Sequence, residues 1–300
     1  MGARRLGDLA HLGTIAQPDV GVVTNIGMAH VGALGGMHRT VEAKGELIES
    51  LPSTGVAVLN ADDPNAPVLA TRTRARILRF GVGPGGKADV QAYEIKMDSE
   101  LRPRFTVETP WGRAEVALRV RGAHQVANAT AAIAVAGALG EPLDRIVEGL
   151  ATATGSRGRL DMLRTTGEVV VLDDTYNANP ASMVAALEAL VAIGVSGERW
   201  AVLGAMAELG EHAVEEHRKV GEAVARLGIG NLVVVGADAL GIVEGTRGAN
   251  VNVAEVPDTD AALEVLSARL RPGDAVLVKA SRAAGLEAVA DGLLRPRNSA

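Results

Sequence analysis

The sequence predicts an α/β fold in two domains, on three observations. The chain has 300 residues, and a domain takes roughly 150. Short valine-rich runs alternate with segments of helical spacing through the second half. A polar, glycine-rich stretch at 152–158 separates the two halves. We therefore expect one domain over residues 1–155 and another over 156–300.

The second half predicts an open sheet with helices between its strands. The expected strands are Val169–Leu172, Trp200–Leu203, Leu232–Val235, Val251–Val256 and Ala275–Val278. The expected helices are Ala181–Ile193, Ala213–Leu227, Ala261–Leu270 and Leu286–Leu294. Nearly continuous apolar strands that alternate with helices are typical of a parallel sheet covered on both faces. This pattern predicts a Rossmann-like α/β domain.

The first half is less regular. Buried strands are expected at Val20–Thr24 and Val56–Leu59, with the helix Val41–Leu51 between them. Because Val20–Thr24 has the composition of a central strand, we expect the chain to begin partway through a domain. Residues 75–120 predict an antiparallel meander of the strands Arg76–Phe80, Val90–Met97, Phe105–Thr109 and Ala114–Val120. The helices Gln125–Leu139 and Leu143–Ala151 follow.

Composition excludes several classes of function. The chain has no cysteine, which excludes disulfides, thiolate zinc sites, iron–sulfur clusters and cysteine nucleophiles. Aromatic residues are 2% and the net charge is −6, which argues against a nucleic-acid partner. No apolar stretch is long enough to insert in a membrane, and no secretory signal is recognised. We therefore expect a cytoplasmic protein.

A glycine-rich segment, Gly81 to Lys87, matches the spacing of a phosphate-binding loop. Such a lysine is followed by Ser or Thr, whereas Ala88 follows here. The loop must also lead into a helix, whose N-terminus then faces the phosphates. Residues 88–95 have a strand pattern instead, so we interpret the segment as a turn.

Two polar residues of the first half are candidates for chemistry. His30 follows a predicted strand, in the region where open α/β sheets bind ligands, and could hold a metal or a phosphate. The alternative is a solvated loop histidine. Lys44 shares an apolar helix face with Ile48. A lysine there is costly unless it is paired or modified, and the alternative is a side chain whose ammonium reaches water.

Two loops of the second half collect polar groups at strand ends. The loop Asp173-Asp-Thr-Tyr-Asn-Ala-Asn-Pro180 suits either a ribose-binding site or ordinary turn and helix-cap chemistry. Lys279, Ser281 and Arg282 follow another strand and suit a carboxylate or phosphate. His212 and His217 do not align on one helix face, so we expect both at the surface.

Eight segments occur together in the order found in Mur ligases, and on them the chain resembles that family. They are Asn25 to His30, Glu42-Ala-Lys44-Gly-Glu46, Asn60-Ala-Asp62-Asp63, Gly122-Ala-His124-Gln-Val-Ala-Asn128, Gly158-Arg159-Leu160, the loop 173–180, Leu203-Gly-Ala-Met-Ala-Glu208 and Lys279-Ala-Ser-Arg282. The resemblance implies a partial P-loop-type ATPase domain with an antiparallel β extension, followed by the Rossmann-like domain. The loop 173–180 resembles that of the member which adds D-alanyl-D-alanine to UDP-N-acetylmuramoyl-tripeptide.

The resemblance implies ATP-dependent amide formation through an acyl phosphate, with Mg²⁺, in a monomeric enzyme. It assigns roles residue by residue, and the implied catalytic residues are Lys44, His30 and Lys279. His30 would contact Mg²⁺, and Lys44 would bridge metal as a carbamylated lysine. Nucleotide contacts would come from Asn128 (adenine), Arg159 (phosphate), Asp174 (ribose), Tyr176 and Asn177. Substrate contacts would come from Asn179, Ser281 and Arg282.

The chain also departs from the family pattern. The family's domain for the uridine nucleotide and its Gly-Lys-Thr or Gly-Lys-Ser loop are not in the sequence, and Ala205 stands where many relatives have Asp. We therefore expect little ligase activity from this chain alone. Two alternatives are a non-catalytic nucleotide-binding or assembly module and a folate polyglutamylation enzyme. The loop 173–180 argues against the second.

Overall fold

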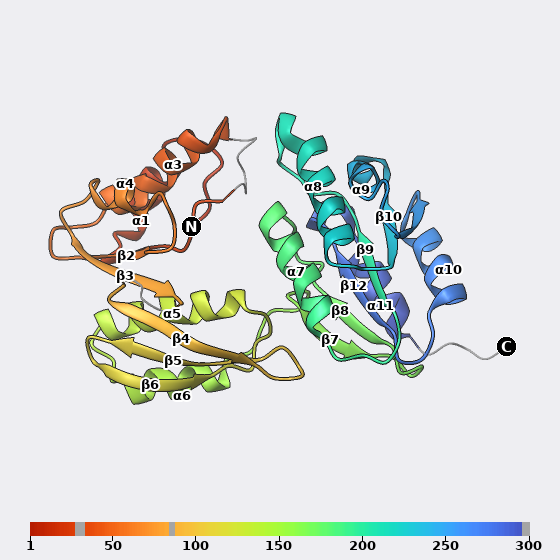
Figure 1. Cartoon of the computed structure of the whole chain (residues 1–300). Coiled ribbons are helices and arrows are strands. Elements are labelled where there is room, and N and C mark those ends of the chain that lie inside the picture. Colours follow the sequence, from red (N-terminus) through yellow and green to blue (C-terminus); the bar gives the residue numbers. More distant parts are fainter. Residues whose placement is uncertain (28–33, 84–87, 296–300) are drawn as a thin grey trace. The chain divides into compact units, whose positions relative to one another are not determined.

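The computed structural model describes residues 1–27, 34–83 and 88–295. Contacts divide the chain into two compact units (Figure 1). Unit 1 comprises residues 1–98 and 102–154, and unit 2 comprises residues 99–101 and 155–300.

Unit 1 is built on a sheet of six strands in the order β1-β2-β3-β4-β5-β6, counted over the described residues. The strands are β1 Val20–Val23, β2 Val56–Asn60, β3 Arg76–Val82, β4 Val90–Met97, β5 Pro103–Thr109 and β6 Gly112–Ala117. Strands β1 to β4 pair in parallel, and β4, β5 and β6 pair antiparallel. The predicted meander is therefore wrong at its first step, since β3 belongs to the parallel part of the sheet.

Strands β3 and β4 are parallel neighbours with few residues between them. The chain must therefore turn back sharply after β3 to begin β4 in the same direction. They pair over three residues only, Phe80–Val82 against Val90–Ala92. Gly83 has a φ of +107°, which glycine adopts without strain, and the Gln91 amide donates to its carbonyl at 2.7 Å. Residues 84–87 of the glycine-rich segment lie outside the described residues. A strand follows that segment, as the turn interpretation requires.

Helices cover both faces of the unit 1 sheet. Helix α5 (His124–Ala138) contacts β2 to β5, and α6 (Leu143–Thr152) contacts β6. Helices α3 (Met37–Glu49) and α4 (Ala66–Ala70) contact β1 and β2. Alternate residues of β2 serve the two faces: Val56 and Val58 pack in one apolar cluster with α5, and Ala57 and Leu59 in another with α3 and α4.

Helix α1 (Asp8–Ala16) is not predicted by the sequence pattern. It packs against α3. The Glu46 carboxylate of α3 accepts hydrogen bonds from the Gly7 amide at 2.6 Å and the Ala10 amide at 3.1 Å. Amides at a helix start need such partners, and here the partner is more than thirty residues away in sequence.

Unit 2 is a mostly parallel sheet in the order β11-β10-β9-β12-β8-β7. Its strands are β7 Asp161–Arg164, β8 Val170–Asp173, β9 Arg199–Leu203, β10 Asn231–Val235, β11 Asn252–Val256 and β12 Ala275–Lys279. Its main helices are α7 Pro180–Ala192, α8 Ala213–Arg226, α9 Gly241–Gly245, α10 Thr259–Arg269 and α11 Glu287–Leu294. Only the edge strand β7, which the sequence did not predict, is antiparallel among these described strands. The α/β class is confirmed for both units.

Valines of the central strands supply two cores in unit 2. On β12, Leu277 packs with α7, α8 and α9, whereas Val276 and Val278 pack with α10 and α11. Both faces are thus buried, which explains the near-continuous apolar runs. Over the residues that the structure describes, no helix is long and apolar enough to cross a membrane.

Candidate functional site

In unit 1, polar groups gather where β1 and β2 end. The Lys44 ammonium of α3 donates to the Asn25 carbonyl at 2.7 Å. Asn60, at the end of β2, donates through its amide to the Thr24 carbonyl at 2.9 Å. Asp63 accepts hydrogen bonds from the amides of Ile26 and Asn65. The loops after both strands are therefore joined by side chains from the segments that the family resemblance singled out.

Lys44 is half-buried at this place, while Ile48, one turn further along α3, is fully buried. Burial lowers the pKa of the Lys44 ammonium, and the nearby Asp63 carboxylate opposes that effect. A lower pKa means that the neutral, nucleophilic amine is more accessible than in an exposed lysine. The side chain is paired with a carbonyl rather than simply reaching into water.

The structure supplies less support for two other predicted site residues of the first half, His30 and Asn128. His30 lies outside the described residues. Asn128 is exposed on α5 and donates from its amide to the Gln125 side chain at 3.0 Å. Within the described ranges, no group of three or more His, Cys, Asp or Glu side chains is arranged to hold a metal ion.

In unit 2, an ion pair between a buried lysine and a partly buried aspartate joins the ends of β8 and β12. The Lys279 ammonium lies 2.7 Å from an Asp174 carboxylate oxygen and donates to the Asn177 carbonyl at 2.8 Å. The other Asp174 oxygen accepts from the Leu160 amide at 3.0 Å. Lys279 is 1% exposed. Burial lowers its pKa, and the Asp174 carboxylate opposes this. Lys279 therefore anchors the loop 173–180 through its contacts with Asp174 and Asn177.

The Tyr176 ring lies among the cations of the same loop cluster. It is 41% exposed. The Arg159 guanidinium stands 4.1 Å from the ring centroid and that of Arg282 stands 5.6 Å away. Asn177 is exposed beside it. Two guanidinium groups around an aromatic face form a site that suits a phosphate or a carboxylate.

Part of the loop does serve turn and cap chemistry. An Asp173 carboxylate oxygen accepts from the amide and hydroxyl of Thr175. Asn179 caps α7, where its side chain accepts from the Ser182 amide at 2.9 Å. The turn and cap alternative is thus observed for Asp173 and Asn179, and the ribose-binding alternative for Asp174 stays a prediction.

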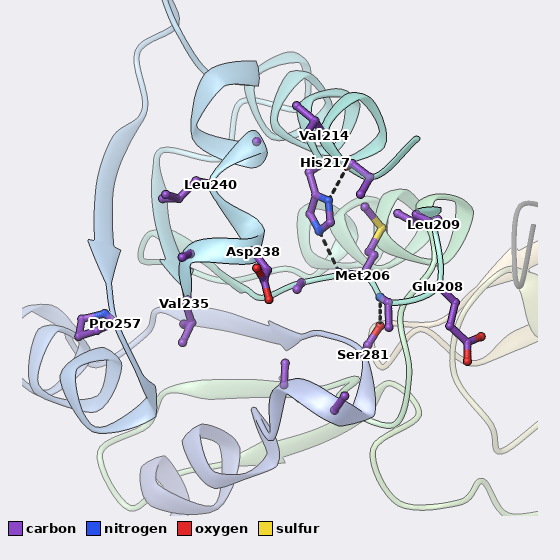
Figure 2. Close-up of a pocket in the computed structure, with 18 of the residues that line it drawn as sticks. Met206, Glu208, Leu209, Val214, His217, Val235, Asp238, Leu240, Pro257 and Ser281 are labelled. Carbon is purple, nitrogen blue, oxygen red and sulfur yellow. Dashed lines mark hydrogen bonds between the residues drawn. The ribbon is translucent and has the colours of Figure 1, made fainter. Parts of the chain in front are cut away.

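A pocket of about 920 Å³ opens at the carboxyl ends of the unit 2 strands (Figure 2). Its wall includes the Ser281 side chain and the loop 205–210. Four residues with carboxylate side chains line it: Glu208, Asp238, Glu244 and Asp258. The described lining residues include no lysine or arginine. An acidic, partly apolar pocket favours a ligand that carries a positive group.

His217 also lines this pocket and corrects a prediction. The sequence placed it at the surface with His212, and His212 is indeed exposed. His217 is 2% exposed. It shares a helical face with Val220, Gly221 and Val224, all of which are buried. That spacing of three, four and seven residues was the signal that could have placed His217 in the core.

Comparison with known proteins gives a consistent result. The model of the Mur ligase middle domain matches residues 1–136, and that of the Mur ligase, glutamate ligase domain matches residues 158–282. The UDP-N-acetylmuramoyl-tripeptide--D-alanyl-D-alanine ligase of Mycobacterium tuberculosis is 44% identical over 98% of this chain. The chain spans 61% of that relative's length.

Solved structures show the same similarity. MurF from Acinetobacter baumannii superposes with a TM-score of 0.88 at 33% identity, over 98% of this chain and 63% of that one. MurF ligase from Thermotoga maritima, solved in complex with ADP, gives a TM-score of 0.84 at 32% identity, over 98% of this chain and 65% of that one.

Proposed function

The chain belongs to the Mur ligase family, and on that premise we propose that it serves the ATP-dependent joining of D-alanyl-D-alanine to UDP-N-acetylmuramoyl-tripeptide. In this reaction the γ-phosphoryl group of ATP passes to the tripeptide carboxylate. The dipeptide amine then attacks the acyl phosphate carbonyl, the amide bond forms and phosphate leaves. Since the substrates are ATP and a UDP-linked precursor, we place the reaction in the cytoplasm. It contributes to peptidoglycan precursor synthesis.

The observation that carries the proposal is the loop cluster of unit 2. Asp174, Tyr176 and Arg159 come together at the carboxyl end of β8, where parallel sheets bind ligands. Asp174 retains oxygen lone pairs beyond its bonds to Lys279 and Leu160, and these suit a ribose hydroxyl. The similar ligase of known structure was solved with ADP, which supports nucleotide binding here.

The pocket beside Ser281 supports the acceptor half of the proposal. D-Alanyl-D-alanine carries an ammonium group, which four carboxylates favour. Ser281 is 4% exposed, and its hydroxyl donates to the Ala178 carbonyl at 3.4 Å, at the limit of a hydrogen bond. Because that hydrogen bond is long, we propose that the hydroxyl turns its proton toward the dipeptide carboxylate when the dipeptide binds. Asn179 follows Ala178 in the sequence and Arg282 follows Ser281, and we propose both as further substrate contacts.

The surroundings of Lys44 fit a carbamate and Mg²⁺. A carbamylated Lys44 would place carboxylate oxygens near the Asn25 carbonyl and Asp63. Oxygen ligands of this kind suit Mg²⁺, which would offset the charge of the phosphates. We propose that Lys44 and Asp63 provide this environment, with His30 as a further contact.

The carbamate has a direct test. Intact mass of the chain should rise by one CO₂ when bicarbonate is supplied under native conditions, and the Lys44→Arg variant should show no rise. Lys96, which is exposed, supplies the matched control: Lys96→Arg should keep the gain. A gain that survives Lys44→Arg would remove Lys44 from the role.

Nucleotide binding and turnover are tested separately. ADP should bind the purified chain, and Tyr176→Ala should weaken that binding about fivefold, the effect of losing one cation–π contact network worth about 1 kcal/mol. Because the sequence contains no Gly-Lys-Thr or Gly-Lys-Ser, we expect little phosphate release from this polypeptide by itself. A fusion protein that joins the remaining N-terminal segment of the M. tuberculosis relative to this chain should release phosphate. We expect that release only when both the tripeptide precursor and D-alanyl-D-alanine are present.

The alternative proposal, a non-catalytic nucleotide-binding module, predicts a different outcome. Under it, ADP binds as before, but the joined polypeptide shows no dipeptide-dependent phosphate release. The joined chain must melt cooperatively and bind ADP for that result to count. Phosphate release that depends on glutamate and a folate in place of the dipeptide would instead favour a polyglutamylating enzyme.

A further inference from the structure

Two consecutive amides in the wall of the acidic pocket are held by side chains from different elements. The Met206 amide donates to His217 Nε2 at 2.9 Å, and the Ala207 amide donates to Ser281 Oγ at 2.7 Å (Figure 2). The Ser281 amide in turn donates to the Ala205 carbonyl at 2.9 Å. The wall formed by residues 205–208 is therefore tied to α8 through His217 and to the end of β12 through Ser281.

The partners of His217 fix which ring nitrogen carries the proton. The Ala213 carbonyl, 2.7 Å from Nδ1, can only accept, so Nδ1 donates. The Met206 amide can only donate, so Nε2 must offer its lone pair. The ring is thus neutral and fully used as a one-donor, one-acceptor link. A side chain without an acceptor here would leave a buried amide without a partner.

Close helix packing holds the imidazole in position. Helix α9 approaches α8 through glycines, and a Cβ at Gly241 would lie 2.9 Å from the His217 Cβ. A Cβ at Gly221 would lie 2.0 Å from the Ile242 carbonyl oxygen. The backbones therefore touch at this crossing, which leaves the His217 side chain little freedom to turn away from Met206.

The wall next to Met206 carries a strained residue. Glu208 has a φ of +63°, a left-handed conformation that residues other than glycine adopt at a cost. Its carboxylate belongs to the lining of the pocket. A segment of this kind keeps its conformation only when neighbouring contacts stabilise it. One such contact is the hydrogen bond from the Met206 amide, two residues before Glu208, to His217.

We propose that His217 is a positioning residue of the acceptor pocket. Through the Met206 amide it sets the wall 205–208, and so places Glu208 and the Ser281 hydroxyl for an amine-bearing acceptor. His217 need not touch the acceptor or take part in proton transfer. This inference rests on the proposed function, because it takes D-alanyl-D-alanine as the occupant of the pocket.

The test compares variants of the whole chain by NMR. His217→Leu removes the acceptor for the Met206 amide, His217→Gln keeps an acceptor oxygen on a side chain of similar reach, and His212→Leu changes the exposed histidine as a control. Exchange of the Met206 amide reports the contact, titration with D-alanyl-D-alanine reports the pocket, and titration with ADP reports the nucleotide site.

We expect His217→Leu to speed Met206 exchange and weaken dipeptide binding about tenfold, the effect of one hydrogen bond of about 1.4 kcal/mol. His217→Gln should recover most of the affinity, and His212→Leu should change neither readout. If His217→Leu does not fold, Gly241→Ala provides the second perturbation. It keeps the imidazole, but its Cβ would lie 2.9 Å from both the His217 Cβ and the Val214 carbonyl oxygen. If it speeds Met206 exchange, it should also weaken dipeptide binding.

The outcomes separate this inference from the proposed function. If wild-type chain binds the dipeptide, and the variants lose Met206 protection without losing affinity, the positioning role is wrong and the acceptor assignment stands. Equal losses in His217→Leu and His217→Gln would also overturn it, since the acceptor atom would then be irrelevant. If wild-type chain binds no dipeptide, the acceptor assignment fails and takes this inference with it. The titration with ADP then tests the nucleotide-binding assignment independently of the dipeptide.

Discussion

The ion pair between Lys279 and Asp174 gives a sharp stability prediction. In Asp174→Asn, Lys279 keeps its carbonyl partners at 2.8 and 3.4 Å but loses the carboxylate at 2.7 Å. Breaking a buried ion pair on one side costs about 3–5 kcal/mol. The remaining carbonyl bonds put this site at the low end, so we expect the free energy of unfolding of unit 2 to fall by about 3 kcal/mol.

The measurement needs a probe that belongs to unit 2 alone. The chain has two tryptophans: Trp111, on the loop between β5 and β6, and Trp200, which is 4% exposed on β9. In a Trp111→Phe background, Trp200 fluorescence during urea unfolding reports unit 2. Asp174→Asn, Lys279→Met and the double variant complete a cycle, and the double variant should regain about 2 kcal/mol over Asp174→Asn.

The pH dependence follows from the lowered pKa of Lys279. The unfolded side chain titrates near 10.5, and the folded one below that value because of burial. Between the two values the unfolded state binds more protons, so stability rises as pH rises through this window. Without the Asp174 carboxylate the folded pKa falls further. The loss in Asp174→Asn should therefore shrink as the pH rises toward 10.5, where the unfolded side chain titrates.

A loss below about 1 kcal/mol at pH 7, together with no coupling to Lys279→Met, would refute the reasoning, because a surface-like ion pair behaves that way. A loss that did not depend on pH would show that Lys279 is not the group left without its partner.

Three further predictions use the same Trp200 assay. Gly158→Ala should cost about 2 kcal/mol, because Gly158 has a φ of +73° and its Cβ would lie 3.1 Å from the Tyr176 amide nitrogen. Gly194→Ala, where a Cβ meets nothing within 4 Å, should stay within about 0.5 kcal/mol of wild type, and equal effects would contradict the argument. Asn179→Ala should cost about 1 kcal/mol through the lost cap of α7, and a neutral result would mean that the cap is not needed. Gly221→Ala should cost about 3 kcal/mol, since its Cβ would overlap the Ile242 carbonyl, and full stability would show that α8 and α9 separate easily.

Much of the fold could be predicted because the relevant signals are local. In unit 2, strands such as Ala275–Val278 are continuous apolar runs, and helices such as Ala213–Leu227 repeat their apolar residues at helical spacing, so the boundaries of the predicted elements there agree within two residues. The prediction failed at β3, where local strand propensity does not distinguish parallel from antiparallel pairing. It also missed α1, whose first amides are satisfied by Glu46 of another helix.

The candidate site divides in the same way. The order of polar residues along the chain pointed to the loop 173–180 and to Lys279, and the chemistry of those side chains did not depend on knowing the fold. The order of residues along the chain did not show which hydrogen-bond partner each of these polar side chains has in the folded structure. Asp173 and Asn179 serve the backbone of their own loop, whereas Asp174 pairs with a lysine 105 residues away.

The sequence by itself determined the α/β class, the family and the identity of the polar groups, because these depend on spacing and residue type along one strand or helix. Only the tertiary structure decided that Lys279 is buried against Asp174 and that His217 holds the Met206 amide inside a core. Burial and partnership are set by which surfaces of distant segments meet, and a side chain's charge state and role follow from that environment.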